Sequence, residues 1–346
     1  MSTSNLDAAD LKGVLAGGLV REDVMDKIWD ISKVPLPFTD MIGSGSASNS
    51  YHEWTQDVLA APDTANAVVD GADASGNNTA LGTRVGNHTQ ISDKVVRVSD
   101  RAEHVTKIGR AKELAYQLSR RQQELRRDVE AIMLLNQASI ADNGDAVAGK
   151  SGGLPAWLET SVNGGAGSAV GGFNTSTKVV DARTVSTARR ALSEATLKSV
   201  IESVYNEGGD PSVLMTVPAI IGKFSDYLFA ATTVAQIRSN VSQTAKDAAA
   251  IGAINVFVSD FATLKLVPNR LQQYHNDGSA ASCADVFILD PAYLSIDYLQ
   301  RVMTKPLART GTAENRQMTV DWTLVVNTEK AHGMVADIDA TTAVVA

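Results

Sequence analysis

The chain of 346 residues is poor in cysteine and in aromatic residues, and both shortages limit what it can be. Cys283 is the only cysteine, which excludes disulfides within the chain and any metal site built from several thiolates. Nothing around Cys283 indicates activation, so we expect a small buried side chain. Aromatic residues make up only 5%, whereas glycine occurs 26 times, which indicates that loops and hairpins account for much of the length.

Long apolar runs and an excess of positive charge are also missing. No run of eighteen apolar residues occurs, so we expect no membrane span. The first ten residues are polar and acidic, unlike a signal peptide, and we expect synthesis in the cytosol. The net charge of −8 argues against a surface that binds nucleic acid throughout, although it is compatible with a container whose wall faces DNA.

Patterns typical of catalytic and metal sites are largely absent. The five histidines share no metal-binding spacing, and each is expected at a surface or an interface; they are His52, His88, His104, His275 and His332. No serine-nucleophile elbow is present. Asp290 precedes Pro291, and we expect it to turn the chain at a strand end. The sequence therefore predicts no catalytic, cofactor-binding or metal-ligating residue, and no enzyme.

One motif offers an alternative. The segment from Gly144 to Lys150 and Ser151 matches the phosphate-binding loop GxxxxGK[ST], and residues 286–290 could supply a strand that ends in a magnesium-binding carboxylate. The mechanism requires a strand before the loop and a helix that begins at the lysine. Here a charged amphipathic segment precedes the loop, and Gly152-Gly153-Leu154-Pro155 follows it. A nucleotide-binding enzyme is therefore the unfavoured alternative.

A long amphipathic segment over residues 109–140 is the strongest local pattern. Its apolar residues recur at helical spacing, at Leu114, Leu118, Leu125, Val129 and Ile132. Asp100 with Glu103 is predicted to cap a short helix just before it. A helix of about 30 residues is roughly 45 Å long, which indicates an elongated subunit rather than a compact enzyme.

Charged residues of both signs are interleaved along this helix. The basic ones are Arg110, Lys112, Arg120, Arg121, Arg126 and Arg127, and the acidic ones are Glu113, Glu124, Asp128 and Glu130. They are either solvated ion pairs or contacts with charges on neighbouring subunits, and the sequence leaves both readings open.

Residues 49–98 form a ribbon pattern. Strands are predicted over 51–59 and 85–98, joined by a long polar excursion over 60–84 whose tip lies at residues 75–78. An isolated pair of strands is marginal in water. We therefore expect another subunit to cover the ribbon, including Trp54.

The remaining elements are shorter. Residues 1–48 carry a short helical pattern at Val24, Ile28 and Trp29, an extended stretch over 34–38 and a flexible joint at 43–46. In the stretch 143–174 the only anchors are Leu154, Trp157 and Leu158. A helix is predicted over 186–206, with Leu192, Val200, Ile201 and Val204 on one side, and another over 218–228 that begins at Pro218. Strands are predicted over 213–217, over 254–259 and 263–267 as a hairpin, and over 286–289, with 318–327 and 334–338 closing the sheet. Clustered helices and strands indicate the α+β class.

Six segments together resemble one known family: YHEW (51–54), VGNHTQIS (85–92), GRAKELAYQ (109–117), VFVSDF (256–261), DVFILDPAYL (285–294) and EKAHG (329–333). In this order they resemble the major capsid proteins of short-tailed phages with the Hong-Kong-97-type fold, over roughly residues 20–340. The resemblance implies five parts: an N-terminal arm (1–48), an extended loop (49–98), a peripheral domain (99–175) with its spine helix at 110–140, an axial domain (176–284), and a return to the peripheral strands (285–346).

The resemblance also implies a function, a set of partners and a location. The subunit would assemble into the hexamers and pentamers of an icosahedral head that encloses double-stranded DNA without sequence-specific binding. A portal protein, and a scaffold or decoration protein, would be its other partners. No catalysis, cofactor or membrane is implied, and the protein would reside in the virion after synthesis in the host bacterial cytoplasm.

Overall fold

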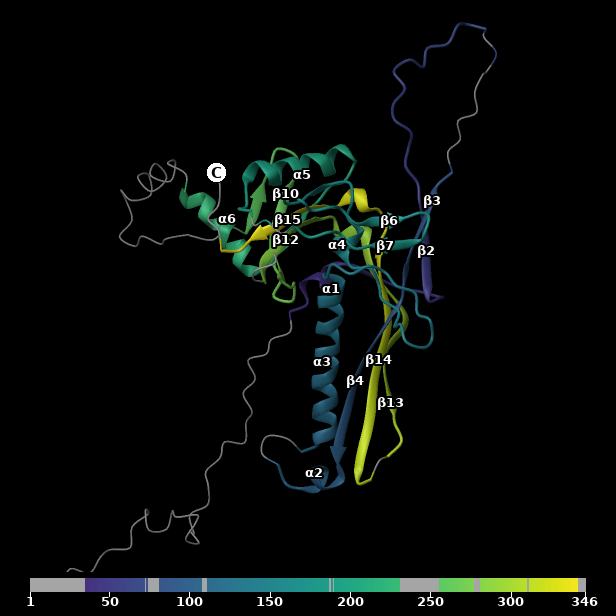
Figure 1. Cartoon of the computed structure of the whole chain (residues 1–346), viewed down its shortest axis with the longest axis vertical. Coiled ribbons are helices and arrows are strands. Elements are labelled where there is room, and N and C mark those ends of the chain that lie inside the picture. The colour runs from purple at the N-terminus through teal and green to yellow at the C-terminus, as the bar shows by residue number, and fades with distance from the viewer. Residues whose placement is uncertain are drawn as a thin grey trace, which may run out of the picture.

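The computed structural model describes residues 35–71, 73, 81–107, 111–186, 188, 190–230, 255–276, 281–309 and 311–341. The fold is α+β and elongated (Figure 1). A long helix and three long strands run together along the lower half, and a second sheet with its helices forms the upper lobe. The helical pattern predicted at Val24, Ile28 and Trp29 and the predicted loop tip at 75–78 lie outside the described residues.

The lower half is built on a four-stranded sheet. Its order is β1 (Gly43–Ser46), β13 (Leu294–Pro306), β14 (Ala313–Val326) and β4 (Gln90–Ser99). β1 runs parallel to β13, so the prediction of a flexible joint at 43–46 is wrong. A Cβ atom on Gly45 would lie 2.5 Å from Oδ1 of Asp297, so glycine permits the close approach of these two strands.

The long helix α3 spans Glu113–Met133, 21 residues or about 31 Å. Leu125, Val129 and Met133 are buried in the core, and Leu118 and Ile132 pack against it, so the predicted apolar stripe is confirmed. The predicted helix over 110–140 is nevertheless too long. Beyond Met133 the polar side chains of Asn136 and Gln137 bond to distant segments instead of continuing the helix.

The short helix α2 (Asp100–His104) precedes α3. Its N-cap is Ser99, whose Oγ accepts the N–H of Ala102 at 3.2 Å, so the prediction of Asp100 as the cap is wrong by one residue. Glu103 instead caps the next helix, because its Oε2 accepts the N–H groups of Leu114 (3.1 Å) and Glu113 (2.9 Å). These bonds lower the pKa of the Glu103 carboxyl.

The upper lobe contains a seven-stranded sheet. Its order is β5 (Val162–Asn163), β15 (Gly333–Asp339), β12 (Ala281–Leu289), β8 (Val213–Thr216), β10 (Thr263–Pro268) and β9 (Val256–Val258), with β11 (His275–Asn276) paired to β12. The predicted hairpin of β9 and β10 is confirmed. β14 and β15 lie in different sheets, so the prediction that both segments close one sheet is wrong.

Two helices accompany this sheet, α5 (Glu194–Asn206) and α6 (Pro218–Ala230). On α5 the predicted core residues Val200, Ile201 and Val204 are buried. The helix predicted to begin at residue 186 begins at Glu194. One reason is that Ser186 uses its hydroxyl in a turn, where it bonds the backbone of Ala188.

Short elements complete the chain: α1 (Pro37–Met41), α4 (Leu154–Trp157), β6 (Gly172–Asn174), β7 (Val179–Asp181) and the 3₁₀ turns η2 (Pro291–Tyr293) and η3 (Glu329–Ala331). α1 lies where an extended stretch was predicted, because Pro37 occupies the first turn of a helix, where its missing N–H costs nothing. The predicted anchors Leu154, Trp157 and Leu158 are all buried.

The ribbon consists of β2 (Tyr51–Gln56) and β3 (Thr83–His88), paired antiparallel. The strand predicted over 85–98 is in fact two strands, since β3 ends at His88 and β4 joins β14 in the four-stranded sheet. At the break, the N–H of Thr89 bonds Ser50 and the carbonyl of His88 accepts the hydroxyl of Thr323. Pairing between β2 and β3 thus ends at His88, and from Gln90 the chain continues as β4 in the four-stranded sheet.

Candidate functional site

The base of the ribbon is fixed to the body of its own chain. The ring of Trp54 lies 5.4 Å from that of Trp157, and Nε1 of Trp54 donates to the carbonyl of Val326 at 3.1 Å. His52 Nε2 lies 3.2 Å from Oδ2 of Asp297 on β13. The covering of Trp54 that we expected from a neighbouring subunit is therefore provided, at least in part, by the same chain.

Asn87 on β3 is the most heavily bonded residue of this base. It is fully buried, its Nδ2 donates to the carbonyl of Leu324 at 2.8 Å and to Ser151 Oγ at 3.1 Å, and its Oδ1 accepts the N–H of Gly152 at 2.8 Å. A buried amide satisfied on both sides fixes orientation strongly. The ribbon therefore leaves the body at a defined angle.

Beyond this base, the loop between β2 and β3 is exposed at all of its described positions, 57–71, 73 and 81–82. Figure 1 shows it as a long excursion away from the body. Five large apolar side chains on it are exposed: Val58 (64%), Leu59 (95%), Val68 (86%), Val69 (79%) and Leu81 (97%). Exposed apolar residues gathered on one projecting element mark a contact with another protein.

The segment that resembles a phosphate-binding loop has another role. The N–H of Lys150 bonds Ile140, that of Ser151 bonds Gln90, and that of Gly152 bonds Asn87. No described strand leads directly into the loop, and the one-turn helix α4 starts only at Leu154. A phosphate cradle needs free N–H groups at a helix start, so the nucleotide-binding alternative has no support here.

The glycines of this segment serve packing and turning. A Cβ atom on Gly153 would lie 1.9 Å from the carbonyl oxygen of Leu135, so the two backbones are in close contact. Gly144 has a φ of +71° with open space around it, as in a tight turn. A Cβ atom on Gly149 would lie 3.0 Å from the carbonyl oxygen of Thr89. A turn at Gly144 and close packing at Gly149 thus account for both glycines of the motif.

Lys150→Ala is expected to change nothing measurable in nucleotide binding. Isothermal titration with ATP and Mg²⁺ should give no saturable heat for either the natural protein or the variant, because the N–H groups of Lys150, Ser151 and Gly152 are already bonded within the chain. The matched variant Lys178→Ala, at another exposed turn, serves as the control for surface charge. Micromolar ATP binding that disappears only in Lys150→Ala would contradict this assignment.

A buried cluster of charges joins Arg183 to three residues of the upper sheet, and no sequence pattern pointed to it. Arg183 is 4% exposed, and its Nη2 bonds both oxygens of Asp285 at 2.8 and 3.0 Å. Its Nη1 bonds Oδ1 of Asp337 at 3.1 Å, and Nε2 of His275 lies 3.1 Å from the same oxygen. Arg183 and Asp337 are 154 residues apart in sequence, so local spacing carries no signal for the pair.

His275, Asp285 and Asp337 offer ligand atoms within 4.8 Å of one another, which is a metal-like arrangement. The guanidinium of Arg183, however, already bonds the carboxylate oxygens that a cation would need. A fixed positive charge at that place opposes a second one. The cluster is therefore best explained as a structural ion-pair network.

The electrostatics agree with this role. Burial alone would raise the pKa of the Asp337 carboxyl, but the hydrogen bond from His275 and the charge of Arg183 hold it well below its usual range. Burial also acts to lower the pKa of Arg183, and the two carboxylates outweigh it and raise that pKa. Both partners are thus held in their charged forms.

Two residues predicted at a surface or at an interface between subunits are buried within the chain. His332 is fully buried, its Nδ1 accepts the N–H of Asp290 at 3.3 Å, and burial lowers its pKa to about 3. Glu130 of α3 is also fully buried and accepts the N–H groups of Phe38 and Thr39 and Nδ2 of Asn269. Burial raises the pKa of Glu130.

The predictions for Asp290 and Cys283 are confirmed, and some of the charges on α3 form ion pairs within the chain. Asp290 Oδ1 accepts the N–H of Ala292 and caps the turn η2, as the aspartate-proline pair predicted. Cys283 is buried. On α3, Asp128 pairs with Lys94 of β4 at 2.6 Å, and Arg121 pairs with Glu124 one turn along the helix. Some of the helix charges thus form pairs within the chain.

Together these features define the class of protein. The long helix packed along a four-stranded sheet, the second sheet in the upper lobe and the projecting loop constitute the Hong-Kong-97-type shell fold (Figure 1). The chain matches the family model of the SU10 major capsid protein over residues 3–339. It therefore belongs to this family of phage major capsid proteins.

One relative is itself a phage major capsid protein, and several solved structures share the fold. The major capsid protein of Escherichia phage Phieco32 is 40% identical over 108 residues, which is 31% of each chain. The capsid of a native GTA particle has a TM-score of 0.56 at 12% identity, and the match covers 97% of this chain and 100% of that one. A structure from Gordonia phage Cozz has a TM-score of 0.54 at 12% identity, and the match covers 97% of this chain and 98% of that one.

The fold extends beyond phage structures. The holo-SrpI encapsulin complex from Synechococcus elongatus has a TM-score of 0.55 at 10% identity, with 97% of this chain and 99% of that chain covered. At such low identity these structures show a shared fold alone. Among the described helices, none has the length and apolar character needed to cross a membrane.

Proposed function

We propose that the chain builds the shell of a phage head, as hexamers and pentamers of an icosahedral capsid around double-stranded DNA. The observation that carries this proposal is the projecting loop of residues 57–82. It exposes Leu59 and Leu81 almost completely and folds onto nothing in its own chain among the described residues. An element of this kind is stable when a neighbouring subunit covers it.

The parts of the fold suggest a division of labour. The arm (1–48) and the extended loop (49–98) would reach neighbours, with β4 of that range belonging to the four-stranded sheet. α3 and the four-stranded sheet would form the peripheral domain. The seven-stranded sheet with α5 and α6, including β15, would form the axial domain at the centre of each hexamer or pentamer.

The subunit would act without catalysis or cofactor. The net charge of −8 supports enclosure of DNA without sequence-specific binding, since a shell wall of this charge does not neutralise phosphates. Its partners would be copies of itself, a portal protein, and a scaffold or decoration protein. The protein would be made in the host bacterial cytoplasm and reside in the virion.

Electron microscopy of the purified protein in negative stain tests the proposal directly. We expect closed shells or ring-shaped hexamers and pentamers, depending on ionic conditions. A protein that stays monomeric under every condition, including in the presence of phage lysate proteins, would contradict the assignment.

Limited proteolysis tests the role of the loop. In the free subunit, cleavage within residues 60–84 should be fast because the described residues of this range, 60–71, 73 and 81–84, are exposed. In assembled shells the same bonds should be cut at least about tenfold more slowly, since a neighbour covers them. Fragments are identified by mass spectrometry. Equal rates in both states would show that the loop makes no contact between subunits.

The double variant Leu59→Ser with Leu81→Ser tests whether the exposed apolar side chains of the loop make the contact. It removes exposed apolar groups without touching the base of the ribbon, so the free subunit should keep its melting temperature. Assembly, followed by light scattering, should require a higher protein concentration. Unchanged assembly would mean that the loop binds through its backbone or not at all.

A further inference from the structure

The turn over residues 142–147 carries chemistry that the building of a shell does not use. Asn143 is followed by Gly144. An asparagine in this position can cyclise, because glycine has no side chain to keep its backbone nitrogen away from the amide carbon Cγ of the residue before it. Residues 141–148 are exposed, and a Cβ atom on Gly144 would meet nothing within 4 Å. The turn is therefore open to the water that the later step of such a reaction consumes.

A carboxylate is bonded to the nitrogen that would attack. The N–H of Gly144 donates to Oδ1 of Asp142 at 2.8 Å. A general base must lie within hydrogen-bond distance of the proton that it takes, and Asp142 meets this condition. Gly144 has a φ of +71°, a left-handed conformation that glycine adopts without strain. The structure thus places a proton acceptor at the nucleophile.

The amide that would be attacked is bonded to two donors. Oδ1 of Asn143 accepts the N–H of Val147 at 2.9 Å and that of Asp145 at 3.0 Å. When Cγ becomes tetrahedral, negative charge gathers on Oδ1, and two backbone N–H groups at these distances stabilise it in the manner of an oxyanion hole. The same two bonds turn the amide toward the chain that follows Asn143, which begins with the nitrogen of Gly144.

We propose that Asn143 is a site of self-modification, at which its amide cyclises with the backbone nitrogen of Gly144 while Asp142 acts as the base. A bond forms between this nitrogen and Cγ, and the bond between Cγ and Nδ2 breaks. The proton of the Gly144 N–H passes through Asp142 to Nδ2, which leaves as ammonia. Water then opens the succinimide ring at one of its two carbonyls, and the product is aspartate or isoaspartate. The reaction needs no cofactor or oxidant, and it does not depend on shell assembly.

The products would alter the surface at the base of the ribbon. Asp142 lines a pocket of about 250 Å³ together with Ser50 and His88, which stand where the ribbon joins the body. An aspartate at position 143 adds a negative charge beside Asp142. An isoaspartate adds one methylene to the main chain and removes the amide oxygen from its present bonds. The reaction therefore changes both the charge and the path of the chain next to the projecting loop.

The sequence contains one other asparagine followed by glycine, Asn163 with Gly164, and this pair serves as an internal control. Asn163 lies in β5, where strand pairing with Val335 fixes its backbone. The carboxylate of Asp337 bonds the N–H of Gly165, one residue beyond the nitrogen that would attack. The pair therefore has the same sequence but, among the described residues, no carboxylate at the nucleophile, and it should stay intact.

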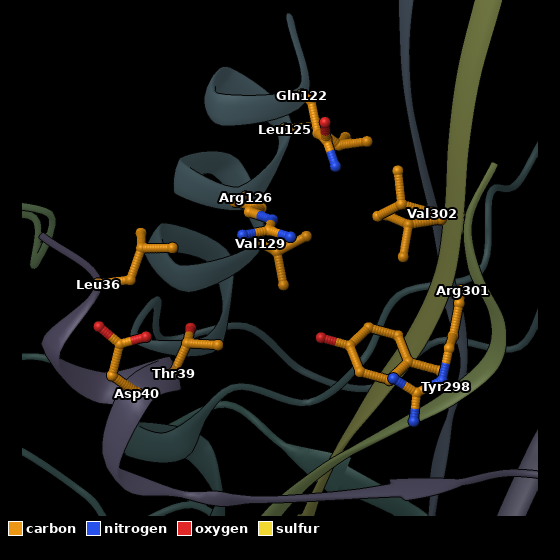
Figure 2. A pocket seen from close by; sticks show the side chains of 11 residues that line it. Leu36, Thr39, Asp40, Gln122, Leu125, Arg126, Val129, Tyr298, Arg301 and Val302 are labelled. Atoms are coloured by element: carbon orange, nitrogen blue, oxygen red, sulfur yellow. The ribbon is translucent and has the colours of Figure 1, made fainter. Parts of the chain in front are cut away.

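Mass spectrometry of the purified full-length chain after incubation at neutral pH tests the proposal. Cleavage after lysine separates the two sites, because Asn143 lies in the peptide 113–150 and Asn163 in the peptide 151–178. The first peptide should lose one ammonia and then gain one water, and a methyltransferase specific for isoaspartate should label it. The second peptide should stay unchanged, and so should Gln122, an amide of the first peptide that lines the groove between α1 and α3 (Figure 2). No loss of ammonia at Asn143, or equal loss at both sites, would overturn the proposal.

Unfolding in urea shows what the structure contributes to the rate. The sequence Asn143-Gly144 remains in urea, but the hydrogen bonds made by Asp142 and by the two N–H groups are gone. The native chain should lose ammonia at least about tenfold faster than the unfolded chain, because a positioned base and an oxyanion donor each contribute more than that at full alignment. A native rate equal to or below the rate in urea would contradict assistance by the fold.

Asp142→Asn tests the base. The replacement keeps an oxygen that can accept the N–H of Gly144 but takes no proton, so the native rate should fall about tenfold, while the rate in urea should not change. Asp145→Asn is the matched control, because it removes the same charge and leaves the backbone N–H of residue 145 in place. The control should react like the natural chain, and equal melting temperatures verify that both variants fold. Equal rates for the two variants would overturn the role of Asp142 and the proposal with it.

Discussion

Replacing Arg183 by Met is expected to lower the free energy of unfolding by about 3–5 kcal/mol, the range found when one member of a buried ion pair is removed. The physical reason is that Asp285 and Asp337 would remain buried, at 5% and 0% exposure, without their guanidinium partner. Urea denaturation of the free subunit measures the change. Arg316→Met is the matched control, because Arg316 pairs with Glu314 at the surface and should cost less than about 1 kcal/mol.

The same variant has a pH signature. The pKa of Asp337 is lowered in the native protein, so its ionised form contributes stability that is present above the ordinary carboxyl pKa and is lost as the pH falls below it. Without Arg183 most of that contribution disappears. The difference in stability between the natural protein and Arg183→Met should therefore be largest near neutral pH and shrink below about pH 4. A difference that is constant with pH would show that the loss comes from packing alone.

Replacing Leu125 by Asp is expected to prevent formation of a stable subunit. Leu125 is 1% exposed and lies in the core between α3 and the four-stranded sheet. A carboxylate buried there without a partner costs several kcal/mol, and the lost apolar contacts of a leucine cost about 2–5 kcal/mol more. Together these costs are comparable with the whole free energy of unfolding of an ordinary domain, about 5–15 kcal/mol. Solubility on expression and circular dichroism measure the outcome.

Gln123→Asp is the matched control for this change. It introduces the same side chain two residues earlier on α3, at an exposed position. The control should remain soluble and differ by no more than about 1 kcal/mol, which is the helix-propensity range. If Leu125→Asp were as soluble and as stable as Gln123→Asp, this face of α3 would not be core.

Local patterns in the sequence were reliable where one element determines the outcome. The spacing of Leu125 and Val129 predicted the buried face of α3, and the spacing of Val200 and Val204 did the same for α5. Pro218 predicted the start of α6. In each case, the periodicity of apolar residues within a few turns decides which face is buried, and no distant partner is needed.

Predictions that depended on distant partners failed. The strand predicted over 85–98 divides at Thr89 because β14, more than 200 residues later, pairs with only its second half. The 13-residue strand β13 went unpredicted, although it supplies the centre of the sheet. Glu130 was expected in a solvated ion pair or in a contact with a neighbouring subunit because its neighbours on α3 are charged. It is buried because it accepts hydrogen bonds from the first turn of α1 and from Asn269.

The sequence by itself determined the class of this protein: α+β, without an assembled catalytic motif, elongated, and similar to capsid subunits. The tertiary structure alone decided the lengths of the elements and which sheet each strand joins. It also decided that Arg183 meets Asp285 and Asp337. The reason is physical, since helix faces follow from short-range spacing, whereas strand pairing and buried ion pairs depend on residues that only folding brings together.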